Sequence, residues 1–156
     1  MIKIQNEILD NIKAEFEQYG YDTLFATEDD TQILKVLVDR LGSDESGNVI
    51  LEMYFVNEEG MDKLKDVSFL QIFATYDCNV SSEMYAETAK VLCELNFITA
   101  LGAFALYEEQ MQLFYKYTYV FNGTDPDILT GNINVVLNWI MGMLEDTYDK
   151  ICELIG

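Results

Sequence analysis

The sequence predicts an α+β fold, in which a mainly antiparallel sheet has helices packed on it. Half of the residues are hydrophobic and 13% are aromatic, which is enough to build a core and is unlike a disordered acidic chain. Apolar residues recur at helical spacing in three segments, and segments rich in Ile, Leu, Val and aromatic residues lie between them. The connections are mostly too short for parallel crossovers. The expected order is α-β-β-β-α-β-β-α, with residues 1–156 as a single domain.

The first expected element is a helix that ends near Gly20. Its apolar residues are three or four positions apart and so form one stripe: Ile4, Ile8, Ile12, Phe16 and Tyr19. Glycine is a common residue just after the end of a helix. Residues 28–30, which are all acidic, are expected to form a loop.

A hairpin and a third strand follow. Residues 33–41 and 49–56 are short and apolar, and the Gly- and Ser-rich segment 42–48 predicts the loop between them. We expect a turn over residues 57–60 and a strand over residues 67–76.

The second half begins with a helix that Ser81 is expected to cap. Its inward-facing residues are Met84, Thr88, Val91, Leu92 and Leu95. Gly102 ends the next connection, and residues 103–107 and 111–121 are expected to form a second hairpin.

A long helix closes the chain. Asp125 and Pro126, the only proline, suit an N-cap and the first helical position. The stripe that we expect to face the core is Ile133, Leu137, Ile140, Leu144, Tyr148, Ile151 and Ile155.

The charge of the chain excludes several classes of function. There are 28 acidic residues against 9 basic ones, which gives a net charge of −19, and there is no histidine. So much negative charge repels nucleic-acid phosphate and anionic lipid, so we expect neither a nucleic-acid partner nor a membrane partner. The missing histidine removes the usual general base and the commonest metal ligand. We therefore assign no catalytic, cofactor-binding or metal-binding residue and expect no enzymatic activity.

The cysteines and the first residues predict a cytoplasmic protein. The three cysteines are an odd number and form no C-x-x-C pair, which favours reduced thiols. The first seven residues are too polar for the apolar core of a signal peptide, and no apolar stretch is long enough to span a membrane.

The predicted strands have apolar residues on both faces, which is the observation that suggests a function. Alternation places Val49, Leu51, Met53 and Phe55 on one face of the second strand, and we expect this face to pack under helices. The opposite faces of the strands carry more apolar residues than a solvated surface needs, and we take these as candidate partner-binding residues: Ile50, Tyr54, Val56, Phe114 and Val120. Two explanations stay open: the middle helix or a second subunit covers this face, or the face is a groove for a segment of another protein.

The chain resembles the YbjN family and, more distantly, the class I type III secretion chaperones. The resemblance rests on the order of the elements and on three local sequence features. These features are the helix ending Leu92-Cys93-Glu94-Leu95-Asn96, the hairpin from Tyr107-Glu108-Glu109 to Tyr115-Lys116-Tyr117, and Asn122-Gly123 before the last helix. The resemblance implies a small, acidic, non-enzymatic bacterial protein that is often dimeric. The chaperones hold an extended client segment on their strands, and YbjN-type proteins are described as sensory-transduction regulators.

The leading hypothesis is therefore a type III secretion chaperone-like α+β domain that forms a homodimer and holds a segment of a partner protein. A second hypothesis is an acidic mimic of nucleic acid that inhibits a basic protein. A third is an enzyme that uses carboxylates.

Overall fold

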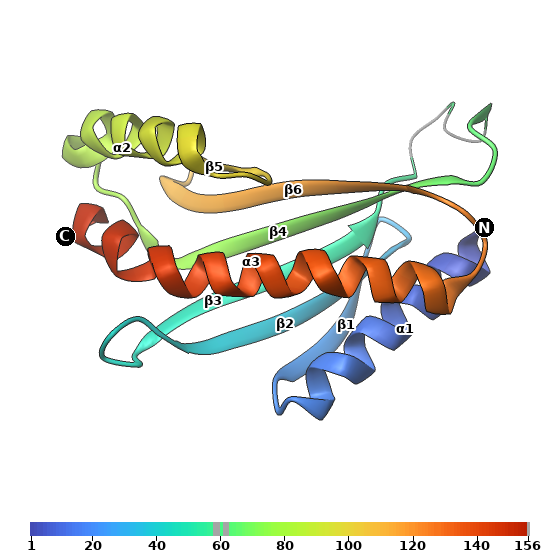
Figure 1. Ribbon diagram of the computed structural model, residues 1–156. Helices are drawn as coiled ribbons and strands as arrows, with labels where there is room; N and C mark the ends of the chain where they lie inside the picture. The colour runs from blue at the N-terminus through green and yellow to red at the C-terminus, as the bar shows by residue number, and fades with distance from the viewer. Residues whose placement is uncertain (58–59, 61–62, 156) are drawn as a thin grey trace.

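The protein is an α+β structure, and its described residues form one six-stranded antiparallel sheet and three α-helices (Figure 1). The computed structural model describes residues 1–57, 60 and 63–155. The helices are α1 (Ile2–Gln18), α2 (Tyr85–Ile98) and α3 (Pro126–Ile155), with a 3-10 turn η2 (Ser82–Met84) before α2. The strands are β1 (Asp22–Glu28), β2 (Thr31–Leu41), β3 (Gly47–Phe55), β4 (Val67–Asn79), β5 (Ala103–Tyr107) and β6 (Gln112–Asn122). The predicted fold class is confirmed.

The element order differs from the prediction by one strand. Residues 28–30, expected to be a loop, end the additional strand β1 and make its tight turn into β2. Asp29 and Asp30 both have positive φ angles, 46° and 63°. A two-residue hairpin turn needs such values at both positions if it is to match the right-handed twist of its two strands. The observed order is thus α-β-β-β-β-α-β-β-α.

The other predicted turns and caps are mostly in place. Gly20, with φ 86°, follows α1, and Gly102, with φ 72°, precedes β5. Asp125 caps α3, because its Oδ1 accepts hydrogen bonds from the amides of Asp127 (3.0 Å) and Ile128 (3.2 Å). Ser81 differs: it precedes η2 instead of α2, and its side chain makes no capping hydrogen bond. The turn expected over residues 57–60 lies partly outside the described residues.

The strands pair in the order β1-β2-β3-β4-β6-β5, so β1 and β5 are the edge strands. Both predicted hairpins are present, as β2–β3 and β5–β6. The second strand of the latter begins at Gln112, because Met111 lies in the turn with φ 52°.

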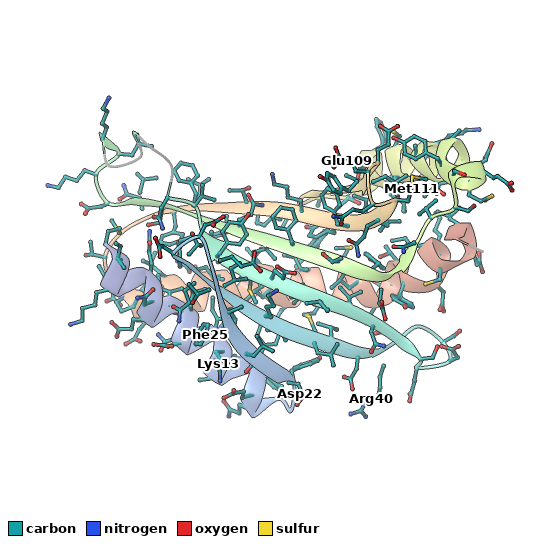
Figure 2. All side chains as sticks on the ribbon, turned by 180° about the vertical axis from the view of Figure 1, so that it is seen from behind. Lys13, Asp22, Phe25, Arg40, Glu109 and Met111 are labelled. Atoms are coloured by element: carbon teal, nitrogen blue, oxygen red, sulfur yellow. The ribbon has the colours of Figure 1, made fainter. Side chains whose placement is uncertain are left out.

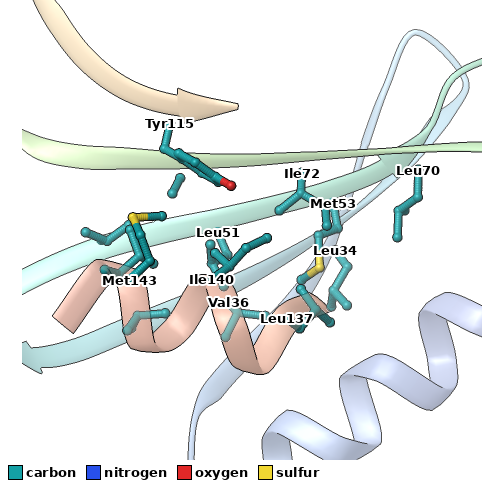
Figure 3. Close-up of a cluster of buried hydrophobic side chains, with 14 of the residues drawn as sticks. Leu34, Val36, Leu51, Met53, Leu70, Ile72, Tyr115, Leu137, Ile140 and Met143 are labelled. Atoms are coloured by element: carbon teal, nitrogen blue, oxygen red, sulfur yellow. The ribbon is translucent and has the colours of Figure 1, made fainter. Parts of the chain in front are cut away.

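The hydrophobic core lies between one face of the sheet and the helices (Figure 3). Val49, Leu51, Met53 and Phe55 are all buried, as their alternation predicted. The stripe of α3 from Ile133 to Ile151 faces them, with Ile133, Leu137, Ile140, Leu144 and Ile151 buried and Tyr148 packed against the cluster. Helix α1 contributes Ile8, Leu9, Ile12 and Phe16.

Helix α2 packs on the same side of the sheet as α1 and α3. Its buried Leu92 and Leu95 belong to the same core cluster. Phe104 of β5, beside this helix, is buried and aligned with Tyr115, a core residue. The helices therefore leave the opposite face of the sheet uncovered, and Figure 2 looks onto that face with α3 behind the sheet.

The side chain of Asn96 closes the free edge of β5. Its Nδ2 donates to the carbonyl of Phe104 (2.9 Å), and its Oδ1 accepts from the amide of the same residue (2.7 Å). An amide side chain here takes the place that the main chain of a further strand would occupy, which protects the edge against pairing with another chain.

Replacing Asn96 with alanine is expected to destabilise the protein by about 1–3 kcal/mol, because both main-chain groups of Phe104 lose their partner. Urea unfolding of N96A and of N96D measures the loss. Aspartate keeps an acceptor for the amide but sets a charge against the carbonyl, so N96D should also be destabilised. Midpoints equal to wild type for both variants would show that this bridge contributes nothing.

No helix in the described part of the chain has the length and apolar character needed to cross a membrane.

Candidate protein-binding face

The uncovered face of the sheet, which we call the open sheet face, carries apolar and aromatic side chains among charged and polar ones. The strand register places one row of side chains across it: Asp22, Leu37, Ile50, Thr75, Phe114 and Ala105. The next row is Leu24, Lys35, Glu52, Phe73, Lys116 and Ala103. The exposed large hydrophobic side chains on this face are Leu24, Leu37, Ile50, Tyr107 and Val120.

An aromatic row crosses the middle of the open sheet face. The rings of Tyr54 on β3 and Phe73 on β4 are stacked, with centroids 6.2 Å apart and an interplanar angle of 15°. Phe73 also contacts Phe114 on β6, with centroids 5.8 Å apart. All three side chains are half-buried, so the row is ordered by its neighbours while one side of it remains accessible. Fixed aromatic side chains are the residues that most often anchor protein interfaces.

The five residues predicted from the sequence lie on or beside this face, in two groups. Tyr54, Phe114 and Ile50 are in the middle, where Ile50 and Phe114 flank Thr75 in one row. Val120 is 56% exposed at one end, opposite Phe69. Val56 lies just past the end of β3, where its amide donates to the carbonyl of Phe69 (2.9 Å), and it is half-buried.

The sequence analysis missed Phe69 and Phe73, which join the two groups. Phe73 stands between Tyr54 and Phe114, and Phe69 stands between Val56 and Val120. The signal was available, since both residues alternate with buried Leu70 and Ile72 along β4.

The two lysines on the open sheet face, Lys35 and Lys116, each have a partner beside them. The Lys35 ammonium lies between two carboxylates, 3.6 Å from Glu28 and 3.9 Å from Glu52. The Lys116 ammonium lies 5.5 Å from the centroid of the Phe73 ring, a cation–π contact. Burial, and then the nearby charge of Glu52, raise the pKa of Tyr54, so its hydroxyl stays neutral at physiological pH.

The polar side chains in the middle of the face are bonded to one another. Gln71, which is 5% exposed, donates from Nε2 to the carbonyl of Tyr117 (3.0 Å). Its Oε1 accepts from the hydroxyl of Thr118 (3.0 Å). These hydrogen bonds hold the polar side chains beside the aromatic row in one arrangement.

In the described part of the chain, no three His, Cys, Asp or Glu side chains lie together so that they could hold a metal ion. Cys93 is exposed on α2. Burial raises the pKa of the Cys152 thiol, which disfavours the reactive thiolate. A groove of about 290 Å³ between α1 and α3 is lined mainly by apolar and amide side chains, among them Tyr19, Leu137 and Asn138.

No protein-family model matches this chain, and no curated protein matches its sequence.

Proposed function

We propose that this chain is a non-enzymatic protein-binding domain that holds a segment of a partner protein on the open sheet face. The observation that carries the proposal is the aromatic row of Tyr54, Phe73 and Phe114 on a face that none of the described helices covers. Exposed apolar side chains with aromatic residues at their centre are a feature of interaction sites. Apart from the additional strand β1, the order of the elements is the one on which the resemblance to the secretion chaperones and YbjN-type proteins rests, and this supports a chaperone-like or regulatory role.

The surface favours a partner segment that is apolar where it meets the aromatic row. Lys35 is already matched by two carboxylates, so the middle of the face offers little unbalanced charge to a strongly charged segment. The net charge of −19 acts at longer range, where it attracts basic partners and speeds their approach. We place this binding in the cytoplasm, which suits an odd number of cysteines without a C-x-x-C pair.

A charged residue in the aromatic row is expected to weaken partner binding by roughly tenfold to a hundredfold. The partner is first isolated from the host lysate with the wild-type chain, and its affinity for F114D and Y54D is then measured with purified proteins. Tyr19, which is 73% exposed at the end of α1, provides the matched control, because Y19D makes the same kind of change away from the face. Equal affinities for wild type, F114D and Y54D would overturn the proposal.

The second candidate, an acidic mimic of nucleic acid, is supported by the net charge alone. The two candidates differ in their dependence on salt. Binding through the aromatic row should survive high salt, whereas binding through many ion pairs should fall steeply as salt is raised.

A further inference from the structure

The outer side of α3 is an uncharged helix surface that faces solvent. Residues 128–144 form the longest run of the chain without Asp, Glu, Lys or Arg. On the outer side of this run, Ile128 is 64% exposed, Val135 is 71% exposed, and Trp139, the only tryptophan, is 36% exposed. Figure 1 shows α3 across the front of the molecule with no other element over it. Three large apolar side chains on one solvent-facing helix stripe are typical of a helix that packs against another helix.

The end of α2 extends this apolar surface. Phe97 is 92% exposed and Ile98 is 74% exposed, beside a groove of about 350 Å³ between α2 and α3. Ile98, Trp139 and Gly142 are among the residues that line this groove. The surface is on the helical side of the molecule and is separate from the open sheet face.

The large and small residues of this stripe are arranged symmetrically about Val135. The stripe consists of Ile128, Gly131, Val135, Trp139 and Gly142, which are separated by three, four, four and three positions and so share one face of the helix. A Cβ atom added at Gly131 or at Gly142 would have no neighbour within 4 Å, so the space over both glycines is open.

We propose that this stripe is the interface of a homodimer, in which α3 of one copy packs antiparallel against α3 of a second copy. When two such helices cross at Val135, Ile128 of each copy faces Gly142 of the other, and Trp139 faces Gly131. Each large side chain then meets a position where the missing side chain leaves room. The same surface patch on both copies is what a twofold interface requires.

The symmetry of the stripe singles out a second copy as the occupant, and the lack of charge on it allows two acidic chains to meet there. Two chains that each carry a net charge of −19 repel one another over most of their surfaces, and the α3 stripe is the longest segment where no charged residue opposes the contact. The ends of the stripe are acidic, with Asp125 and Asp127 at one end and Glu145 and Asp146 at the other. Because these ends meet in the antiparallel pair, raising the salt concentration is expected to strengthen the dimer.

The test is sedimentation velocity over a range of protein concentrations, with wild type and two variants. Wild type is expected to dimerise, and V135E should raise the dimer dissociation constant by roughly tenfold or more, because the two new carboxylates face one another. V120E, which places the same charge on the open sheet face, should dimerise like wild type. A wild-type chain that stays monomeric at high concentration and moderate salt would overturn the proposal, and so would a dimer that V135E leaves intact. The proposed partner binding is tested independently of the dimer, by the affinity of F114D for the partner.

The variant G131A distinguishes a role of Gly131 in the dimer interface from a role in the stability of the monomer alone. Within the monomer, G131A is expected to stabilise α3 and to raise the melting temperature by roughly 2–4 °C, because alanine is the better helix former and its Cβ meets no atom within 4 Å. In the dimer the same methyl group stands where Trp139 of the second copy packs. G131A should therefore raise the melting temperature of the V135E monomer and weaken the dimer.

Tryptophan fluorescence reports the dimer directly, since the emission of Trp139 should shift to shorter wavelength as the protein concentration rises. No shift, or a G131A dimer as tight as wild type, would contradict the proposed packing.

Discussion

Replacing Gly47 with alanine is expected to destabilise the protein by about 3 kcal/mol, at the upper end of the usual cost of overpacking. Gly47 starts β3 and is buried against the ring of Tyr148 from α3. A Cβ atom at this position would overlap two atoms of that ring and would lie 2.7 Å from the main-chain oxygen of Leu41. The ring is itself held in place, since it stacks on Tyr76 with centroids 5.8 Å apart. The loop cannot shift freely either, because the amide of Ser43 donates to the Asp149 carboxylate (3.0 and 3.2 Å).

A double-mutant cycle with Y148A tests this explanation of the Gly47 effect. Without the ring, most of the overlap disappears, so G47A should cost clearly less in the Y148A background than in wild type. Urea unfolding of the four proteins gives the coupling free energy. An equal cost in both backgrounds would place the origin elsewhere, in the backbone contact with Leu41.

The elements that the sequence predicted well are those with a strong local signal. The stripe of α1 up to Phe16, the alternation of β3 and the Asp125-Pro126 start of α3 each follow from rules that act within a few residues. Tyr19, the last residue of the expected stripe, lies beyond α1 and is exposed. Strand β1 lacked such a signal. Its sequence is short and half polar, and its turn uses Asp29 and Asp30 where asparagine and glycine are the usual residues. It becomes a strand because β2 offers it a partner, which is a tertiary effect.

The candidate site was predicted in part for a related reason. Alternation along single strands is enough to find residues such as Tyr54 and Phe114. Which face of the sheet receives α2 depends instead on packing between distant segments, because its Leu92 and Leu95 share one core cluster with residues of α1 and α3. Local patterns carry no information on this choice, and the open sheet face therefore became visible only in the structure. The outer stripe of α3 did have a sequence signal, the uncharged run over residues 128–144.

Tyr115 is expected to make the protein lose stability steeply above pH 10. Its side chain is fully buried against Phe104, and its hydroxyl donates to the carbonyl of Leu101 (2.6 Å). Burial raises the pKa of Tyr115 far above its usual value of 10.0, and the nearby Tyr117 acts in the same direction. Above pH 10 the unfolded chain releases this proton while the folded chain retains it. The stability is therefore fully present below pH 10 and falls by about 1.4 kcal/mol for each pH unit until the pKa of the folded state is reached.

The variant Y115F isolates this contribution from the other groups that titrate at high pH. Burial also raises the pKa values of Tyr54 and Tyr117, with the same sign, and these residues are unchanged in Y115F. At pH 8 Y115F should be less stable than wild type by about 1–2 kcal/mol, because the Leu101 carbonyl loses its donor. Between pH 10 and 12 the difference should shrink and then reverse, since phenylalanine has no proton to lose. Urea unfolding at several pH values gives both curves, and parallel curves would mean that Tyr115 ionises as easily in the folded protein as in the unfolded chain.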